Sequence, residues 1–543
     1  MRKLSCFAIG LIILFNSCVK EKFDSSKLAG STNFTGIAIP IGYAHMTLQR
    51  YFNDSTANKG VMMDANGFIT LVYREKVFSL NAQNIFVFQD VSGSDTIFQP
   101  GLKKKNSYNA EITDTVFIQI IPQASGIQIN SMKLKSGMLS LAIHNDMPVQ
   151  GTYSITFPGI TDSNGTIVQT PIFNFGPDTT ISLDLSSHAL TLVNHNGQDN
   201  FLNAIIDLNL TQGGFTPGSE LFGLGFNLRN IQYSVFYGYV GKASIPINKG
   251  SFPLNFYQRL LGGNFYFSDP RMKLLFTNSI GVPIEIYFTD IHALTKTGPM
   301  FIASIGNGNS VPGSANPKTI QYPSIPYTLA KDSIVLDTTN STIRAVFDAV
   351  PTQMTFSLVD SINPQGTLHS NKNFVLDTSK LEADLQIELP LQGHTDSLLL
   401  IQDTLKFEFA SFIYKNPKEV NLIYFLLNVT NGFPVEIIPQ IYFTDDRGKY
   451  LDSLIDMSQP DLMIPAAPID GNGIVTGTSS NKITVKFPPA RIQNIENATH
   501  LITRGRIKSS KYPANVKFLN SKNYYLDFNL GVIVQLQVNT SLK

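Results

Sequence analysis

Residues 422–445 read LIYFLLNVTNGFPVEIIPQIYFTD and decide the fold more clearly than any other stretch. An apolar run rich in β-branched and aromatic residues leads to Asn431, and a second such run follows Pro434. The Asn side chain can bond local backbone groups, and Pro has no N–H to offer a central β-ladder. We therefore expect two strands, between which the chain crosses over or reaches a sheet edge.

Two further copies of this unit precede it. Asn145 and Pro148 belong to NDMPV, and Asn278 and Pro283 belong to NSIGVPI, where the spacing is changed. Successive prolines are 135 and 151 residues apart, which is a domain spacing and not a solenoid spacing. We predict duplicated or triplicated β-domains in which these Asn and Pro residues have structural roles. The alternative is a common turn that recurs by chance.

The remainder of the chain carries the same strand signal. Runs such as TVFIQII at 115–121 and GVIVQLQV at 531–538 are separated by Gly, Asn, Asp and Pro. The predicted fold class is mainly β, with multiple antiparallel β-sandwich domains, Ig-like or related, and few short helices. The helix candidates are 45–52, 255–261 and 452–457. We expect three β-domain regions, each with one Asn/Pro unit, at 36–230, 231–412 and 413–543.

The strand–Asn431–Pro434–strand arrangement resembles the water-stress (WHy-type) domain of late-embryogenesis-abundant proteins. That family has an Asn-Pro-x-x-x-Pro centre, and its first Pro is missing from all three copies here. The resemblance implies an Ig-like sandwich with a binding or structural role. It carries no catalytic residue over to this chain.

The first 18 residues carry an export signal. Two basic residues precede FAIGLIILF at 7–15, an apolar segment of signal-peptide length that is too short to span a bilayer as a helix. The residues FNSC at 15–18 resemble the bacterial lipobox, which implies cleavage before Cys18 and acylation of its thiol. We predict a lipoprotein signal peptide at 1–17, a polar tether at 18–35 and membrane attachment through the lipid on Cys18. The alternative is an ordinary secretory signal with an incidental cysteine.

The FNSC motif and the many Asn, Lys and Ile residues resemble lipoproteins of Bacteroidetes. Lys20 and Glu21 partly resemble the surface-export signal of that group. The resemblance implies an outer-membrane location and leaves the periplasmic and surface-exposed faces both open. Cys6 leaves with the signal peptide, so the mature chain has no internal disulfide.

Composition excludes several classes of protein. Lys and Arg total 41 against 40 Asp and Glu, so the basic face that a nucleic-acid partner needs is not expected. The hydrophobic fraction of 43% and the charged fraction of 15% are unlike those of a disordered chain. No later apolar run reaches the length of a membrane-spanning helix.

The sequence contains no catalytic or metal-binding motif. The eight histidines lack metal-ligand spacings, and Gly223-Leu224-Gly225 lacks the third glycine of a dinucleotide fingerprint. GNGNS at 306–310 is interpreted as a flexible loop. The acidic segments that begin at Asp162 and Asp445 could offer oxygens to Ca²⁺, but we favour hairpin turns there. We predict no catalytic residue, cofactor or metal; the alternative is an active site formed by distant acids that converge.

One tripeptide, Asp-[Ser/Thr]-[apolar or Thr], is enriched. It resembles the Bacteroidetes O-glycosylation signal, which acts on exported proteins; alternatively, the Asp caps a turn that leads into a strand. Neither interpretation implies an activity. The ten copies begin at Asp54, Asp95, Asp114, Asp178, Asp332, Asp337, Asp360, Asp396, Asp403 and Asp452.

The function we expect is a non-catalytic binding or structural role in the cell envelope, as a subunit of an outer-membrane complex with an outer-membrane protein as partner. Low charge and 38 Phe would also suit a lipid or hydrophobic-ligand binding protein. The third candidate is a surface glycan-binding protein or hydrolase. The chain has no Trp for sugar stacking, although Tyr233, Tyr237 and Tyr239 on one strand face could substitute.

Overall fold

Strands make up most of the computed structural model, with two short α-helices among the residues that it describes. Cys18 and the tether lie outside those residues. The structure describes residues 37–47, 60–84, 86–98, 110–123, 126–144, 149–176, 178–213, 220–254, 260–306, 309–366, 373–406, 420–455 and 463–536.

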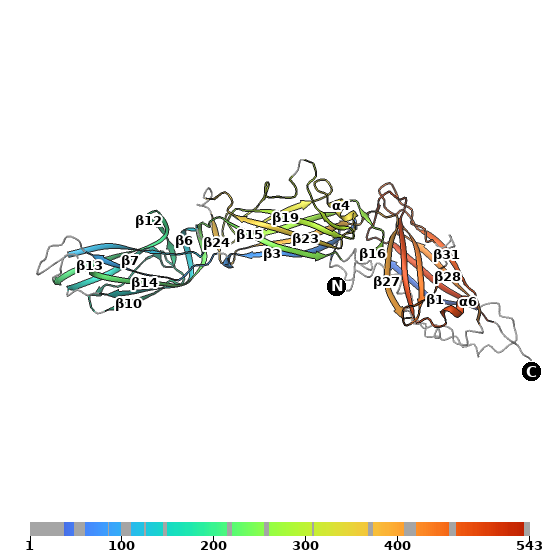
Figure 1. Ribbon diagram of the computed structural model, residues 1–543, viewed down its shortest axis with the longest axis horizontal. Helices are drawn as coiled ribbons and strands as arrows, with labels where there is room; N and C mark the ends of the chain where they lie inside the picture. Colours follow the sequence, from blue (N-terminus) through green and yellow to red (C-terminus); the bar gives the residue numbers. More distant parts are fainter. Residues whose placement is uncertain are drawn as a thin grey trace, which may run out of the picture.

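Three β-sandwiches stand in a row, and we call them distal, central and proximal (Figure 1). The first layer of the distal sandwich contains β4 (Val91–Phe98), β14 (Glu220–Tyr239), β6 (Gln128–His144) and β10 (Thr179–Asp184). Its second layer contains β5 (Ala110–Gln119), β13 (Gln198–Gly213) and β7 (Val149–Thr161), edged by β8 (Ile167–Gln169), β9 (Phe173–Asn174) and β12 (Val193–His195). β11 (Ala189–Thr191) pairs with both β6 and β7 and so joins the layers.

The central sandwich has the same plan. Its first layer is β3 (Ile69–Asn81), β25 (Lys380–Pro390), β18 (Arg271–Asn278) and β22 (Ala330–Leu336), with β2 (Val61–Met63) beside β3. Its second layer is β15 (Ala243–Pro253), β23 (Gln353–Ile362) and β19 (Ile284–Thr295), edged by β20 (Gly298–Phe301) and β21 (Lys318–Ile320).

The proximal sandwich repeats the plan again. Its first layer is β1 (Ile37–Thr47), β34 (Tyr525–Leu536), β28 (Val420–Asn431) and β31 (Ser479–Phe487). Its second layer is β27 (Leu398–Lys406), β32 (His500–Ser509) and β29 (Val435–Thr444), edged by β16 (Leu260–Gly262) and β30 (Tyr450–Ser453). The short helices α4 (Ile343–Asp348) and α6 (Pro489–Ile495) directly precede the equivalent strands β23 and β32.

The three sandwiches are nested along the sequence. The chain forms β1 of the proximal sandwich, then β3 of the central one, then the whole distal sandwich. It then adds β15 to the central sandwich and the short edge strand β16 to the proximal one, completes the central sandwich by β25, and completes the proximal one with strands from β27 to β34. Both insertions fall at the same point of the shared plan, between the first strand of one layer and the first strand of the other.

The pairing of strands from distant parts of the chain can be compared with the three contiguous regions expected from the sequence. β1 lies in the range 36–230 and β34 in the range 413–543, yet the two strands pair antiparallel from Ile37↔Val534 to Thr47↔Tyr525. The sheets therefore combine segments from opposite ends of the chain. The three contiguous ranges stay a prediction about the sequence, whereas the mainly β, multi-sandwich fold class is confirmed.

Short strands close the joints between sandwiches. β24 (Phe374–Leu376) leaves the central sandwich to pair with β14 of the distal one, and Val235 packs there against Phe374 and Leu376. At the other joint, β17 (Tyr266–Phe267), β26 (Gln392–His394) and β33 (Val516–Lys517) form a three-stranded sheet. The backbone N–H of Asn520 donates to the Gly67 carbonyl at 2.7 Å, which ties the proximal sandwich to the central one.

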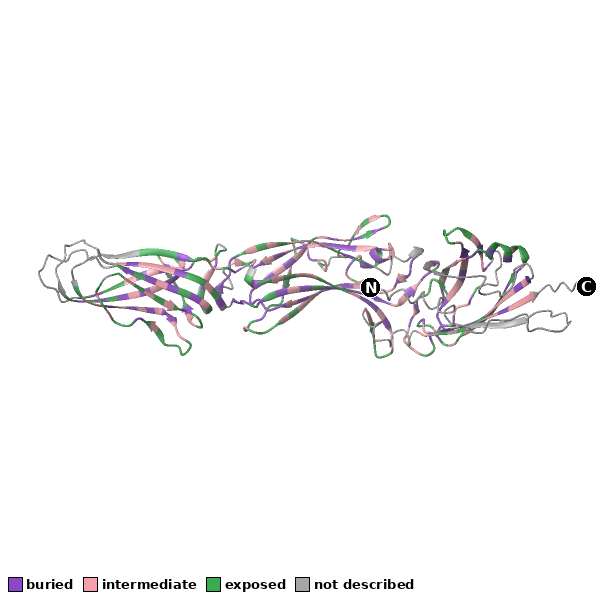
Figure 2. Cartoon of the chain, turned by 90° about the horizontal axis from the view of Figure 1, so that it is seen from below, coloured by how far each residue is buried: buried purple, intermediate pink, exposed green. Residues whose placement is uncertain are grey.

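Period-two burial explains why these segments are strands. Along β6 and β18 buried side chains alternate with more exposed ones, and Figure 2 shows this alternation in all three sandwiches. The buried side chains form one continuous hydrophobic core through the row, apart from a small cluster at the distal–central joint. Sandwiches that share a core and are joined by several chain crossings have little freedom to rotate independently.

Two helix candidates are corrected. His45 lies in β1 and Asp452 in β30: of the candidate 45–52 the described residues 45–47 are strand, and of the candidate 452–457 residues 452–453 are strand and 454–455 form a bend. Backbone pairing with β34 and β29 outweighs local helix propensity there. Of the third candidate, 255–261, the described residues Leu260 and Leu261 lie in β16. The helices α4 and α6 were not expected.

Candidate functional site

The Asn/Pro units are the points where the chain passes from one layer of a sandwich to the other. The unit with Asn278 joins β18 to β19, and the unit with Asn431 joins β28 to β29. In each unit the Asn Oδ1 accepts the N–H of the residue two positions on, at 2.8 Å. Both Asn side chains are fully buried. Asn145 and Pro148 lie outside the described residues, in the equivalent connection from β6 to β7.

The Asn and Pro residues of these two crossings also hydrogen-bond to residues farther along the chain, at equivalent positions in the two sandwiches. Asn278 Nδ2 donates to the Gln321 carbonyl at 3.2 Å, and Asn431 Nδ2 donates to the Pro465 carbonyl at 2.9 Å. The Pro283 carbonyl accepts the N–H of Asn363, and the Pro434 carbonyl accepts the N–H of Ser510. Asn363 and Ser510 directly follow the equivalent strands β23 and β32. In the two described units these hydrogen bonds fix the crossing from one layer to the other.

The acidic turns satisfy their own backbone. Asp162 Oδ1 accepts the N–H groups of Asn164 and Thr166, and Asp445 Oδ1 accepts those of Arg447 and Lys449, all at 2.8–2.9 Å. The hydrogen bond from Thr166 lowers the pKa of Asp162. Carboxylates that are committed to N–H donors are poorly placed to bind Ca²⁺. These segments are hairpin turns.

Each sandwich holds one histidine–aspartate pair on its surface. The Nδ1–Oδ1 distances are 2.5 Å for His144–Asp178, 2.8 Å for His292–Asp290 and 2.5 Å for His45–Asp527. In the part of the chain that the structure describes, no three His, Cys, Asp or Glu residues are grouped so that they could hold a metal ion.

The glycines of Gly223-Leu224-Gly225 lie in β14, where they line a shallow hollow of about 460 Å³ on the distal sandwich. Leu224 points into the core, since its side chain is buried. A strand with alternating glycines offers neither the loop nor the helix N-terminus that a dinucleotide requires. The tyrosine stripe of the same strand does not form a sugar-binding platform, because bulges break the alternation, and Tyr233 and Tyr239 are buried while only Tyr237 is exposed.

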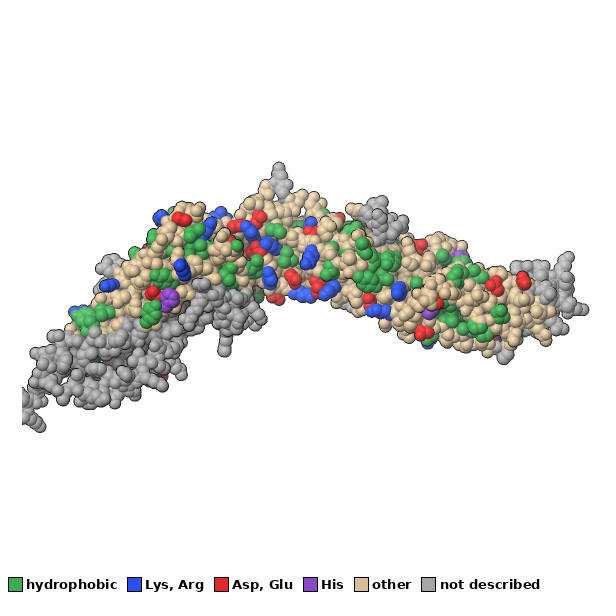
Figure 3. Space-filling view, turned by 180° about the vertical axis from the view of Figure 1, so that it is seen from behind, with side chains coloured by type: hydrophobic (Ala, Val, Ile, Leu, Met, Phe, Trp, Pro, Cys, Tyr) green, Lys and Arg blue, Asp and Glu red, His purple; other side chains and the backbone are tan. Residues whose placement is uncertain are grey.

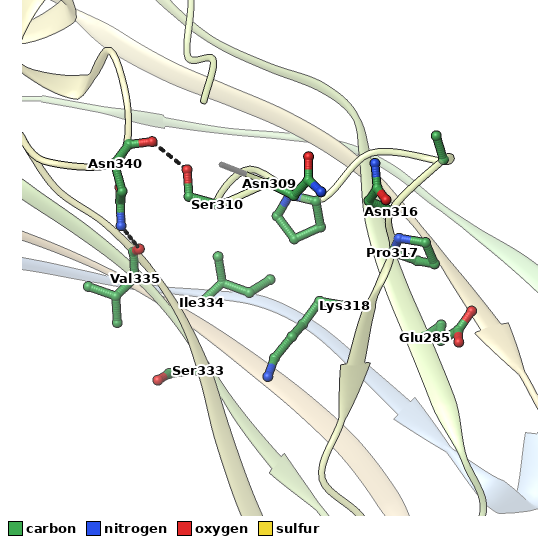
Figure 4. Close-up of a pocket in the computed structure, with 12 residues that line it drawn as sticks. Glu285, Asn309, Ser310, Asn316, Pro317, Lys318, Ser333, Ile334, Val335 and Asn340 are labelled. Atoms are coloured by element: carbon green, nitrogen blue, oxygen red, sulfur yellow. Dashed lines mark hydrogen bonds between the residues drawn. The ribbon is translucent and has the colours of Figure 1, made fainter. Parts of the chain in front are cut away.

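The most developed hollow is a groove of about 640 Å³ in the central sandwich (Figure 4). It lies between the edge strands β21 and β22, where the two layers open to the side. Residues of the segment 309–317, in the connection from β20 to β21, line one wall. Polar side chains predominate in its lining, which includes Glu285, Asn309, Ser310, Asn316, Lys318, Ser333 and Asn340.

The wall of this groove is fixed by Asn340. Its backbone carbonyl accepts hydrogen bonds from Ser310 Oγ and from the N–H of Ile305. Its side-chain Nδ2 donates to the Val335 carbonyl at 2.9 Å (Figure 4). Ser304 Oγ accepts the N–H of Val311 at 2.9 Å within the same connection. The groove is therefore preformed, and Asn309 and Ser310, which the sequence placed in a flexible loop, belong to its anchored wall.

The charges beside the groove compensate one another. Lys318 Nζ lies 3.3 Å from Asp332 Oδ2, which also accepts the N–H of Gln321 at 3.0 Å. Asp332 Oδ1 accepts the N–H of Ser333 at 2.7 Å. Glu285 adds a second carboxylate to the lining. The groove thus offers hydrogen-bonding groups without a strong field of either sign.

Asp360 is the most perturbed acid of the described residues. It belongs to β23, its side chain is fully buried on the inward face with Leu358 and Ile362, and both carboxylate oxygens lack a hydrogen-bond partner among the described residues. This burial raises the pKa of Asp360 to about 7. Because Asp360 is fully buried and cannot reach a substrate, it affects the stability of the fold. The sequence showed Asp360 only as one of ten Asp-Ser/Thr copies.

Neither α4 nor α6 has the length and apolar character of a membrane-spanning helix, and the described residues contain no other α-helix. Cys18, the predicted site of lipidation, lies outside the described residues.

Comparison with known proteins gives little. No family model and no curated protein matches the chain, so the resemblance to water-stress domains stays a prediction. Similar solved structures include a Parabacteroides distasonis protein described as secreted, with 14% identity and a TM-score of 0.30 over 56% of this chain and 89% of that one. Infectious bursal disease virus (Gx strain) has 8% identity and a TM-score of 0.15, over 86% and 81%. Discoidin II from Dictyostelium discoideum has 11% identity and a TM-score of 0.13, over 55% and 93%. Likenesses at these TM-scores carry no argument about function.

Proposed function

We propose that the protein is a lipoprotein of the outer membrane with a non-catalytic binding role, in which the lipid on Cys18 holds a row of three nested sandwiches at the envelope surface. One observation carries most of this proposal: β1, the strand that follows the tether, pairs along its length with β34 in the proximal sandwich. β1 therefore lies in the sandwich at the end of the row opposite the distal one. The distal sandwich is the part of the row farthest from β1 (Figure 1).

The nesting supports a role as a spacer or extended binding subunit. The backbone passes between neighbouring sandwiches more than once at each joint, and short strands pair across or at the joints, which supports a fixed position of the central groove relative to β1. A lipidated anchor combined with such a row would hold a binding site at a set distance from the bilayer. An outer-membrane protein is the partner we propose for the assembly.

Surface charge supports a partner other than nucleic acid. On the face shown in Figure 3, Lys and Arg are interspersed with Asp and Glu over the central sandwich. A surface of this kind lacks the single-sign field that polyanions need. The two hollows described above open to solvent and have linings of mixed polar and apolar character, which does not favour the alternative of a hydrophobic-ligand carrier.

Metabolic labelling with an alkyne palmitate tests the anchor. We expect the intact protein to incorporate the label and to fractionate with the outer membrane. The variant Cys18→Ala should incorporate no label and appear in the soluble fraction, because three acyl chains provide the membrane affinity. A wild-type protein that stays unlabelled would refute the anchoring. Pull-down of the labelled lipoprotein from native envelopes, with recovery of an outer-membrane protein, tests the partner.

A further inference from the structure

We propose that the groove between β21 and β22 binds a neutral, polyhydroxylated ligand, a sugar residue of a glycan. This inference rests on the proposed binding role and specifies the ligand class. The groove volume of about 640 Å³ falls within the roughly 300–1,000 Å³ of typical small-ligand sites.

The groove is an addition to the shared sandwich plan. In the distal sandwich, β8 and β9 run against β7 at the corresponding edge, and only residues 170–172 connect them. In the central sandwich the connection before β21 runs from residue 302 to residue 317, and Ile305 and Ser310 within it hydrogen-bond to the Asn340 carbonyl. The distal copy folds with a much shorter connection at the same edge, so the anchored connection of the central copy, which lines a groove with polar side chains, is more readily explained by ligand binding than by folding.

The edge of β22 is closed to a peptide strand. An extended peptide would need the outward-facing backbone groups of this strand. The N–H of Ser333 already donates to Asp332 Oδ1, and the Val335 carbonyl already accepts from Asn340 Nδ2. Recognition in this groove must therefore come from side chains.

Those side chains match hydroxyl groups. The carboxamides of Asn309 and Asn316 are exposed, and neither hydrogen-bonds to another residue that the structure describes; both line the groove in Figure 4. Each carboxamide presents a donor and an acceptor side by side, as the neighbouring hydroxyls of a sugar ring require. The hydroxyl of Ser333 can also donate and accept.

Charge argues for a neutral ligand. Lys318 is paired with Asp332, and Glu285 leaves the rim slightly acidic, so an anionic ligand would gain little. Val335, Pro312 and Pro317 supply an apolar surface for the C–H groups of a sugar ring in place of an aromatic platform.

Binding of soluble oligosaccharides to the purified full-length lipoprotein in detergent tests the inference. The probes are neutral gluco-, manno- and galacto-oligosaccharides and N-acetylglucosamine oligomers, with polygalacturonate as an anionic arm and an extended peptide as a third. We expect saturable binding of at least one neutral probe, measured by calorimetry and saturation-transfer NMR. The double variant Asn309→Ala, Asn316→Ala should weaken it at least about tenfold, because two hydrogen-bonding groups are lost.

The matched control is Asn174→Ala, which removes an exposed carboxamide from the equivalent edge of the distal sandwich and should leave affinity unchanged. A second variant, Ala315→Trp, fills the groove and should abolish binding without altering the far-UV circular dichroism spectrum. Failure of every neutral probe, binding that survives both groove variants, or binding of only the anionic or peptide probe would overturn the inference. Palmitate labelling is read separately, so loss of sugar binding with a labelled Cys18 removes this inference alone.

Discussion

The central and proximal sandwiches have the same strand order, the same crossing Asn and equivalent short helices, yet one buried position in the second layer of the central sandwich holds an acid. The crossings place Ile286 against Asp360 in the central sandwich and Ile437 against Ile507 in the proximal one. The proximal sandwich therefore has an aliphatic side chain at the position of this acid. The central sandwich also holds the groove, which residues of the segment 309–317 help to line.

This difference separates two kinds of feature. Contacts that recur in both sandwiches, such as the Asn Oδ1 bonds and the Pro carbonyl bonds, are requirements of the shared fold. Features that the described residues show in the central sandwich and not in its distal counterpart are of another kind: Asp360 lowers stability, and the groove is the candidate binding site proposed above. A fold can accept such additions because function depends on local sites and not on the sandwich itself.

Replacing Asp360, the buried acid of the central sandwich, should change the stability of the protein most. Burial raises the pKa of Asp360 from 3.8 to about 7, so the folded state binds its proton more tightly than the unfolded state. Stability then falls as the pH rises from about 4 to about 7, and above that range the cost reaches up to about 4 kcal/mol. Asp360→Ile should therefore stabilise the central sandwich strongly at pH 8 and little below pH 4. Hydrogen exchange of β18 and β23 amides measures this locally.

The reverse exchange sharpens the same comparison. Ile507→Asp should transfer the pH dependence to the proximal sandwich, read from exchange of β29 and β32. Equal protection of the wild type and Asp360→Ile at pH 5 and pH 8 would show that the acid at position 360 is not buried as described.

Replacing the Asn at each crossing should change the free energy of unfolding by less than replacing Asp360 does, and by different amounts in the two sandwiches. Asn431 makes three hydrogen bonds to the backbone, with Phe433, Val435 and Pro465, and Asn278 makes two, with Ile280 and Gln321. Each buried backbone group left without a partner costs about 1 kcal/mol or more. We expect Asn431→Ala to lower the free energy of unfolding by about 3 kcal/mol and Asn278→Ala by about 2 kcal/mol. Denaturant titration, with exchange to identify the sandwich affected, measures both; a larger loss for Asn278 would contradict the ranking.

Substitutions in the hairpin turns at the ends of β29 and β19 should give the smallest difference in stability between the two sandwiches. Asp445 accepts two N–H groups in the proximal turn, whereas in the central turn Thr295 Oγ1 accepts one N–H at 3.2 Å and donates to the Gly298 carbonyl. Asp445→Ala should cost about 1 kcal/mol. Thr295→Ala should cost less, because its accepted bond is long. Thermal unfolding of the two variants side by side decides this, and an equal shift in Tm would remove the distinction.

Much of the fold could be predicted from the sequence. There is a physical reason why the rest could not. Alternating burial makes runs such as β18 recognisable, and the buried Asn with a following Pro marks a crossing because both residues act locally. The pairing of β1 with β34 joins residues that are separated by most of the chain, and no local pattern in residues 37–47 indicates which strand they pair with. The groove was equally hidden, since Asn340 anchors its wall from outside the loop.

Disulfide trapping across β1 and β34 tests the nested arrangement most directly. Tyr43 and Asn529 are exposed and lie opposite each other in this pair, and the mature chain has no other free thiol if Cys18 is acylated. With Tyr43→Cys and Asn529→Cys together, oxidation should join the two peptides within one molecule, seen by mass spectrometry of a non-reduced digest. Tyr43→Cys with Ser480→Cys, on the far strand β31, should stay reduced. A reduced first pair, or linkage only between molecules, would contradict the account.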